Sequence, residues 1–179
     1  MLSYHSGLEQ AVEEHRLPFV SANVANEHLF GLIIGINNYQ DENIRKLEGC
    51  VRDSENVCRF LTESLHANPL HIRHLRDSEA TRKGILSAFK EHLINNQDIQ
   101  QNDAIVFYFA GHGSYEIPEE NYFPGNKMEA ICPYDDRKGA RGIPDRTFAS
   151  LMRHLAVLKG NNIVSVIICT HFTSYNFIF

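Results

Sequence analysis

Residues 106–114, VFYFAGHGS, place a run of bulky apolar residues directly before His112, which lies between two glycines. A continuous apolar run of this kind is typical of a strand buried on both faces of a parallel sheet. A strand over residues 104–110 puts His112 at its carboxyl end, where open α/β sheets carry their ligand-binding and catalytic loops. Because the glycines leave its backbone uncrowded, His112 is either a catalytic base or a residue that ends the strand in a turn.

Three further segments have the pattern of strands, and helical patterns separate them. The strand candidates are residues 29–36, 71–75 and 163–168. Strands that alternate with helices predict an α/β fold with a mostly parallel sheet covered by helices on both faces. We expect the strands that end near residues 110 and 168 to be neighbours. A nucleotide-binding doubly wound domain is disfavoured, because neither LIIGINNYQ nor FAGHGSYE has a phosphate-cradling glycine pattern.

The predicted helices are segments with apolar residues at helical intervals: residues 50–65, residues 85–93 and the segment from Asp145 to Gly160. Asp145 is the expected N-cap of the last helix, and Gly160 is its expected terminator. The expected buried face of this helix consists of Phe148, Leu151, Met152, Leu155 and Leu158. Residues 114–144 are rich in glycine, proline and acidic residues and predict a long excursion with one small strand in MEAIC.

The composition favours a soluble intracellular protein. The chain has 179 residues, of which 43% are hydrophobic, enough for one compact domain. A net charge of −5 without a basic run argues against nucleic acid or an anionic membrane as a partner. The four cysteines lack zinc-type spacing, and the first twenty residues lack a signal-peptide pattern. We therefore expect a cytoplasmic protein with a polar extension over residues 1–27 and one domain over residues 28–179.

Five ordered motifs resemble the caspase-like domain of metacaspases, particularly its fungal forms. They are LIIGINNYQ, LEGCVRDSENV, VFYFAGHGSYE, MEAICPYDD and RGIPDRTF. The resemblance covers residues 29 to about 168 and implies a three-layer caspase-like fold. It also implies a cysteine endopeptidase that cleaves proteins after arginine or lysine. We expect no required cofactor, with calcium as the one candidate. His112 matches the family's general base, and its spacing from Cys169 is similar to the roughly 50 residues between histidine and cysteine in caspases.

The nucleophile segment departs from the family pattern, which is Asp-x-Cys-His-Ser-Gly after the fourth strand. Aligned without a gap, Ile168 replaces the aspartate, Thr170 replaces the nucleophile and His171 keeps the histidine. A shift of one residue makes Cys169 the nucleophile instead, without the aspartate. We expect a weak or inactive endopeptidase. The alternatives are a catalytically inactive caspase-like interaction module and a truncated gene product whose fold is incomplete at the C-terminus.

The resemblance also implies a binding pocket for a basic side chain of a protein or peptide substrate. Asp53, with Cys50 nearby, matches the acidic side of this pocket, and Ile168 replaces its second aspartate. A partly desolvated carboxylate pairs with arginine and repels acidic side chains, although Asp53 is alternatively an ordinary solvated charge. Many metacaspases need calcium, for which Asp135 and Asp136 are the candidate ligands; the alternative is an acidic surface turn.

Overall fold

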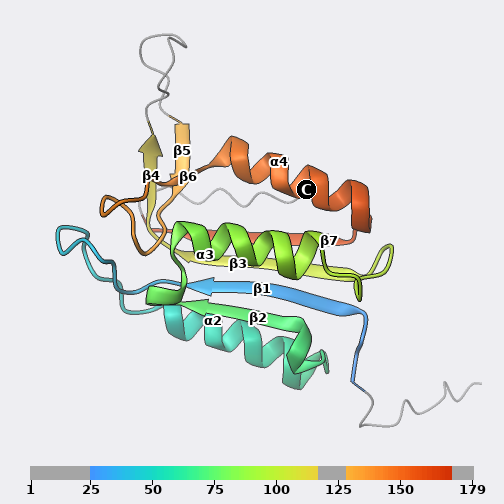
Figure 1. Cartoon of the computed structure of the whole chain (residues 1–179). Coiled ribbons are helices and arrows are strands. Elements are labelled where there is room, and N and C mark those ends of the chain that lie inside the picture. The colour runs from blue at the N-terminus through green and yellow to red at the C-terminus, as the bar shows by residue number, and fades with distance from the viewer. Residues whose placement is uncertain (1–24, 117–127, 171–179) are drawn as a thin grey trace, which may run out of the picture.

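The computed structural model describes residues 25–116 and 128–170. Its central sheet has four strands in the order β2-β1-β3-β7, and each neighbouring pair is parallel (Figure 1). The four strands are β1 (Leu29–Gly35), β2 (Ile72–Arg76), β3 (Ala104–Gly111) and β7 (Ile163–Cys169). Each lies where the apolar patterns predict a strand. The expected pairing of the strands that end near residues 110 and 168 is confirmed, because β7 lies beside β3.

Helices cover both faces of this sheet, so the predicted three-layer α/β fold is confirmed (Figure 1). One face packs against α2 (Cys50–Arg59), which continues as a π-helical segment, Phe60–Ser64. The other face packs against α3 (Arg82–Ala88), with its π-helical continuation Phe89–Ile94, and against α4 (Asp145–Lys159). Across the described ranges, no helix combines the length and apolar character needed to span a membrane.

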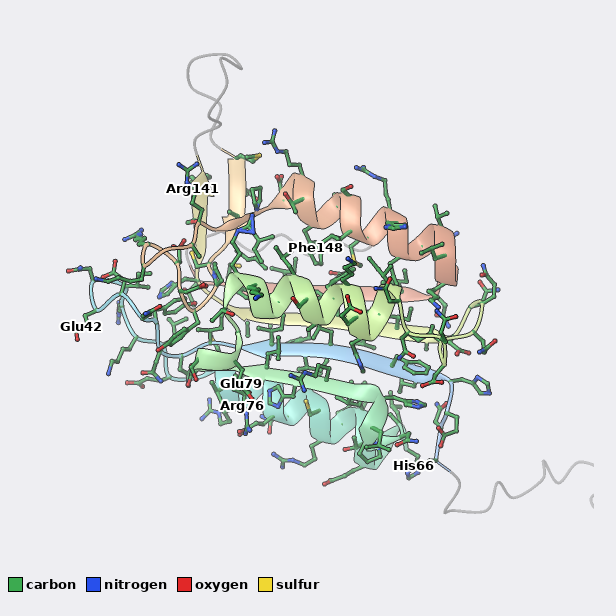
Figure 2. All side chains as sticks on the ribbon, viewed as in Figure 1. Glu42, His66, Arg76, Glu79, Arg141 and Phe148 are labelled. Atoms are coloured by element: carbon green, nitrogen blue, oxygen red, sulfur yellow. The ribbon has the colours of Figure 1, made fainter. Side chains whose placement is uncertain are left out.

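Alternation along β3 divides the apolar core between the two faces of the sheet. Phe107 and Phe109 belong to the core under α3 and α4, whereas Tyr108 and Ala110 belong to the core under α2. Phe148 extends from α4 toward the sheet, and its ring centroid lies 4.5 Å from that of Phe107 (Figure 2). Full burial of each such phenylalanine contributes about 1.5–3 kcal/mol to stability. The middle of β3 is therefore fixed by packing from both sides.

The segment after His112 contains more regular structure than the sequence predicts. A second, antiparallel sheet consists of β4 (Gly113–Glu116), β5 (Met128–Ile131) and β6 (Ile143–Pro144). The small strand predicted in MEAIC is confirmed as β5, whereas β4 and β6 were not predicted. The alternative prediction for His112, a turn at the GHG motif, was wrong, since β3 passes through His112 directly into β4.

The last helix differs from its prediction in two details. Pro144 is the N-cap, with φ −63° and ψ 147°, and Asp145 is the first helical residue. The expected terminator is confirmed, since Gly160 follows the helix with φ +94°. Leu158 is 46% exposed although it was expected in the buried face. The buried stripe of α4 is narrow and consists of Phe148, Met152 and Leu155.

The first described residues are hydrogen-bonded to the rest of the domain. The amide of Asn26 donates a hydrogen bond of 2.6 Å to the carbonyl oxygen of His66, and His28 Nδ1 lies 2.9 Å from a carboxylate oxygen of Asp103. The expected extension over residues 1–27 lies, apart from residues 25–27, outside the described residues.

Close contact between β1 and α2 generates a prediction about stability. A Cβ atom on Gly35 would overlap the side chain of Ser54 and lie 2.6 Å from the carbonyl oxygen of Cys50. We predict that Gly35→Ala lowers the free energy of unfolding by about 1–3 kcal/mol, because α2 must move away from the strand. Urea denaturation measures this loss. Gly49→Ala is the matched control, since its added Cβ would meet nothing closer than 3.5 Å. Equal losses in the two variants would contradict the prediction.

Candidate active site

The ends of β3 and β7 bring His112 and Thr170 together. Gly111 pairs in register with Cys169, and the amide of Thr170 donates a hydrogen bond of 3.3 Å to the carbonyl oxygen of Gly111. His112 and Thr170 directly follow these paired residues. Because β3 and β7 are parallel, both side chains lie at the same carboxyl edge of the sheet.

Both ring nitrogens of His112 have hydrogen-bond partners. Nε2 lies 2.7 Å from the backbone carbonyl oxygen of Arg45, and Nδ1 lies 2.8 Å from Thr170 Oγ1. Since a carbonyl oxygen can only accept, we infer that the neutral imidazole carries its proton on Nε2. The Thr170 hydroxyl therefore donates to Nδ1. This is the geometry in which a histidine base takes a proton from an attacking nucleophile.

The backbone of His112 is also held, and one partner is a residue that the sequence analysis missed. Its amide donates to the hydroxyl oxygen of Tyr39 at 2.7 Å, and its carbonyl oxygen accepts from the amide of Cys132 at 2.9 Å. Tyr39 belongs to the LIIGINNYQ motif, but nothing in that motif identifies which backbone group the phenol reaches. With these bonds His112 is only 6% exposed, and its imidazole is fixed at both main chain and side chain.

Gly111 provides space for Tyr39. A Cβ atom at this position would lie 2.8 Å from Cζ of Phe109 and 3.0 Å from the hydroxyl oxygen of Tyr39. Gly111 lies in extended backbone at the end of β3 and does not need the positive φ that a turn would require. The first glycine of the GHG motif is thus explained by close packing around the histidine.

Cys169 faces away from this contact. Side chains alternate along a strand, so Cys169 points to the opposite side of β7 from Thr170, and it packs against the core under α3 and α4. Burial raises the pKa of the Cys169 thiol to about 12, so the group is a neutral thiol near pH 7. The hydrogen bond to His112 Nδ1 comes from Thr170, the residue that the ungapped alignment places at the nucleophile position.

A pocket of about 410 Å³ adjoins the His112–Thr170 pair. Besides these two residues, its lining consists of Arg45, Lys46, Leu47 and Glu48. This loop segment was not predicted to form part of the site. Its position depends on backbone hydrogen bonds, including the one from the amide of Leu47 to the carbonyl oxygen of Asn37 at 2.8 Å. Such bonds are independent of side-chain identity, so no sequence signal could have indicated the segment.

Asp53 and Cys50, the expected substrate-binding residues, lie next to this pocket and are not part of its lining. Burial, and after it the charge of Asp53, raises the pKa of Cys50. The carboxylate of Asp53 is half exposed, and Oδ2 lies 3.5 Å from the place that a Cβ on Gly49 would occupy. Because Gly49 directly follows Glu48, the Asp53 carboxylate lies near the end of the segment that lines the pocket.

Asp135 and Asp136, the expected calcium ligands, have other partners in this structure. Asp135 Oδ1 accepts a hydrogen bond of 2.7 Å from the amide of Arg82, and Asp136 is buried with Oδ2 3.9 Å from Nε of Arg137. Within the described ranges, no group of three His, Cys, Asp or Glu side chains gathers as metal ligands. Calcium takes six to eight oxygen ligands, which this pair alone does not supply. Calcium binding stays a prediction, and no step proposed below depends on it.

A three-layer α/β fold, with a histidine at the end of one strand hydrogen-bonded to the residue at the end of the next, is the arrangement of a caspase-like domain. The sequence profile of the family described as metacaspase, peptidase C14 domain, matches residues 31–176, so this chain belongs to the metacaspase family. A crystal structure of protein GSU0716 from Geobacter sulfurreducens has a similar fold, with a TM-score of 0.58 at 17% identity. That match covers 78% of this chain and 48% of the other.

Curated relatives come from fungi and plants. Metacaspase-1 of Candida glabrata is 34% identical over 58% of this chain and 27% of its own length. Metacaspase-1 of Kluyveromyces lactis is 34% identical over 69% of this chain and 29% of its own length. Metacaspase-3 of Arabidopsis thaliana is 27% identical over 66% of this chain and 33% of its own length. The chain thus matches about a third or less of each of these relatives.

The burial of Cys169 predicts how its thiol reacts. Burial raises the pKa of Cys169 to about 12 and that of Cys58 to about 11. Since the thiolate is the reactive form, we expect iodoacetamide to label Cys169 more slowly than Cys58 at pH 8. Both rates should rise about tenfold per pH unit until the pH reaches the pKa. Mass mapping of labelled peptides measures the rates. Faster labelling of Cys169 that slows in His112→Ala would show that the histidine activates this cysteine.

Proposed function

We propose that the chain is a caspase-like endopeptidase domain whose histidine base is in place and whose nucleophile position holds Thr170. The observation that supports this is the 2.8 Å hydrogen bond from Thr170 Oγ1 to His112 Nδ1. As residue 170 attacks a peptide carbonyl, His112 Nδ1 would accept its proton and later return it to the leaving amine. The carbonyl oxygen of Arg45 accepts from Nε2–H and so stabilises the imidazolium that forms.

The threonine hydroxyl makes this domain a very slow enzyme or an inactive one. A hydroxyl is a far weaker acid than a thiol, whose ordinary pKa is about 8.5, so an imidazole generates much less attacking anion from it. Cys169 would reach His112 only if β7 slipped by one residue. That slip would break the pairing of seven residues with β3 and turn every side chain of β7 to the other face. Thr170 is therefore the better-supported occupant of the nucleophile position.

The proposed substrates are proteins or peptides with arginine or lysine at the cleavage site. Two carboxylates support this preference, Asp53 near Gly49 and Glu48 in the pocket wall, and they act against the positive charges of Arg45 and Lys46 in the same wall. Ile168 is 48% exposed at the position where the family has its second aspartate, so this chain has less negative charge there. Weaker binding of a basic side chain would lower the rate further, in addition to the loss caused by the threonine. The cytoplasmic location expected from the composition stays a prediction.

A catalytically inactive interaction module is the second candidate function. Its supporting observation is β7, which is the outermost strand of the described sheet, with Val164 55% and Ile168 48% exposed. An open strand edge beside exposed apolar side chains can bind an extended segment of a partner protein by strand addition. This candidate needs no chemistry at residue 170.

Restoring the family's nucleophile tests the first candidate. The unmodified chain should hydrolyse arginyl peptides very slowly or not at all. Replacing residues 168–173 by Asp-Cys-Cys-His-Ser-Gly should raise the rate by at least about a hundredfold, because a thiol replaces the hydroxyl beside His112. His112→Ala in the same background should abolish the gain, and Thr170→Ser, which keeps a hydroxyl, should give none. Release of a fluorescent arginyl leaving group measures turnover.

Two outcomes would change the proposed function. Robust turnover by the unmodified chain, blocked by a thiol alkylator and by Cys169→Ala, would make Cys169 the nucleophile. A restored chain that folds and whose new thiol is alkylated rapidly, yet cleaves no arginyl peptide, would favour the interaction module.

The acidic side of the pocket generates a separate prediction. In the restored background, Asp53→Asn should lower kcat/KM for an arginyl peptide by about tenfold, because it removes a charge that pairs with the guanidinium. The matched peptide with citrulline in place of arginine should be affected little, since its side chain is neutral. Parallel kinetics on both peptides measure the selectivity. An equal loss on both peptides would assign Asp53 to the structure of α2 and not to specificity.

A further inference from the structure

The amide of His112 lies beyond the last paired residue of its neighbouring strand. The last backbone hydrogen bond where β1 and β3 end runs from the amide of Ile36 to the carbonyl oxygen of Ala110, at 2.9 Å. Backbone groups of alternate residues point to the same side of a strand, so the amide of His112 points to the side that β1 has just left. The hydroxyl oxygen of Tyr39 accepts this amide at 2.7 Å and takes the place of the missing strand neighbour.

The loop that carries Tyr39 also carries Arg45. Its ends are joined by the hydrogen bond from the amide of Leu47 to the carbonyl oxygen of Asn37, and the amide of Gln40 donates to the carbonyl oxygen of Tyr134 at 2.9 Å. One anchored loop therefore holds the main chain of His112 through a phenol and the side chain through a carbonyl group.

Packing also holds Tyr39 in place. The phenol is buried, and its ring centroid lies 5.2 Å from that of His112 with the planes tilted by 44°. Burial raises the pKa of Tyr39 above its ordinary range, so the hydroxyl stays neutral at the pH of any ordinary assay. Besides His112, the ionisable groups that act on it are the thiols of Cys50, Cys132 and Cys169, whose pKa values are also raised by burial. No charge among them competes with the hydrogen bond near pH 7.

We propose that Tyr39 is a positioning residue that sets where Nδ1 of His112 meets the side chain of residue 170. This inference rests on the proposed function in one respect, the use of His112 as the base. Displacing a catalytic group by even about 1 Å can reduce a rate about a hundredfold, so a bond at the backbone of the base influences the chemistry without touching the substrate.

The test uses the full chain with Thr170→Cys, so that the new thiol reports on the imidazole. A thiol held against a histidine has an apparent pKa below the ordinary value of about 8.5. Adding Tyr39→Phe should move the midpoint of the iodoacetamide pH–rate profile back toward that value and slow alkylation at pH 7 by about tenfold. Tyr108→Phe is the matched control, because Tyr108 is a buried tyrosine of β3 that lies four positions before His112. It should leave the midpoint unchanged.

The outcomes separate positioning from a general structural role. If both tyrosine variants shift the midpoint equally, or if neither does, the positioning role is overturned. An ordinary midpoint already in the Thr170→Cys parent would also overturn it, because His112 would then not be held against residue 170. If the midpoint shifts as expected while no arginyl peptide is cleaved, the proposed function fails and the positioning role stands.

A second measurement covers the case in which Tyr39→Phe does not fold. In the unmodified chain, the amide proton of His112 should exchange with solvent as slowly as the paired amides of β3, because Tyr39 accepts it in a buried setting. Amide exchange followed by NMR measures this rate. Rapid exchange of this one proton, with the amides of β3 protected, would overturn the proposal.

Discussion

The in-register pairing of β3 with β7 is the interaction on which the site depends. Because Gly111 lies opposite Cys169, the residues that follow each of them, His112 and Thr170, meet at the strand ends. β3 cannot adjust its position, since it has strand neighbours on both edges and packed side chains on both faces. The active-site geometry is thus a consequence of how the core is packed, and a shift by one residue would exchange the side chain that faces the histidine.

In the candidate site, the hydrogen-bond geometry of His112 does not depend on the acidity of the group at position 170. The carbonyl oxygen of Arg45 requires a proton on Nε2 of His112, which leaves Nδ1 as an acceptor whatever residue occupies position 170. A hydroxyl and a thiol can both donate to that acceptor, so either group can contact the imidazole. The two differ in acidity, and this difference appears only when the group has to lose its proton. An intact hydrogen-bond network is therefore compatible with a large change in reactivity.

The strands of the central sheet, its helices and the place of His112 were predictable because long apolar runs and helical spacing reflect burial directly. The alignment of Thr170 with the nucleophile was one of two alternatives, and the alternation of side chains on β7 favours it. In the antiparallel sheet, the apolar piece MEAIC predicted β5, whereas β4 and β6 were not predicted. Tyr39 reaches a backbone amide 73 positions away, and Arg45 acts through a carbonyl group that every residue has. Neither contact could be predicted from the local sequence.

Within the described ranges β7 is the outermost strand of the central sheet, which has a consequence for the candidate site. Thr170 directly continues this strand, and its hydroxyl lies one residue beyond the last pair with β3. A chain that pairs with the outer edge of β7 would change the twist of this strand. A small rotation of β7 would move Thr170 Oγ1 relative to His112, whose position is fixed by its own hydrogen bonds. Binding at the edge of the sheet would in that case change the distance between Thr170 Oγ1 and the imidazole of His112.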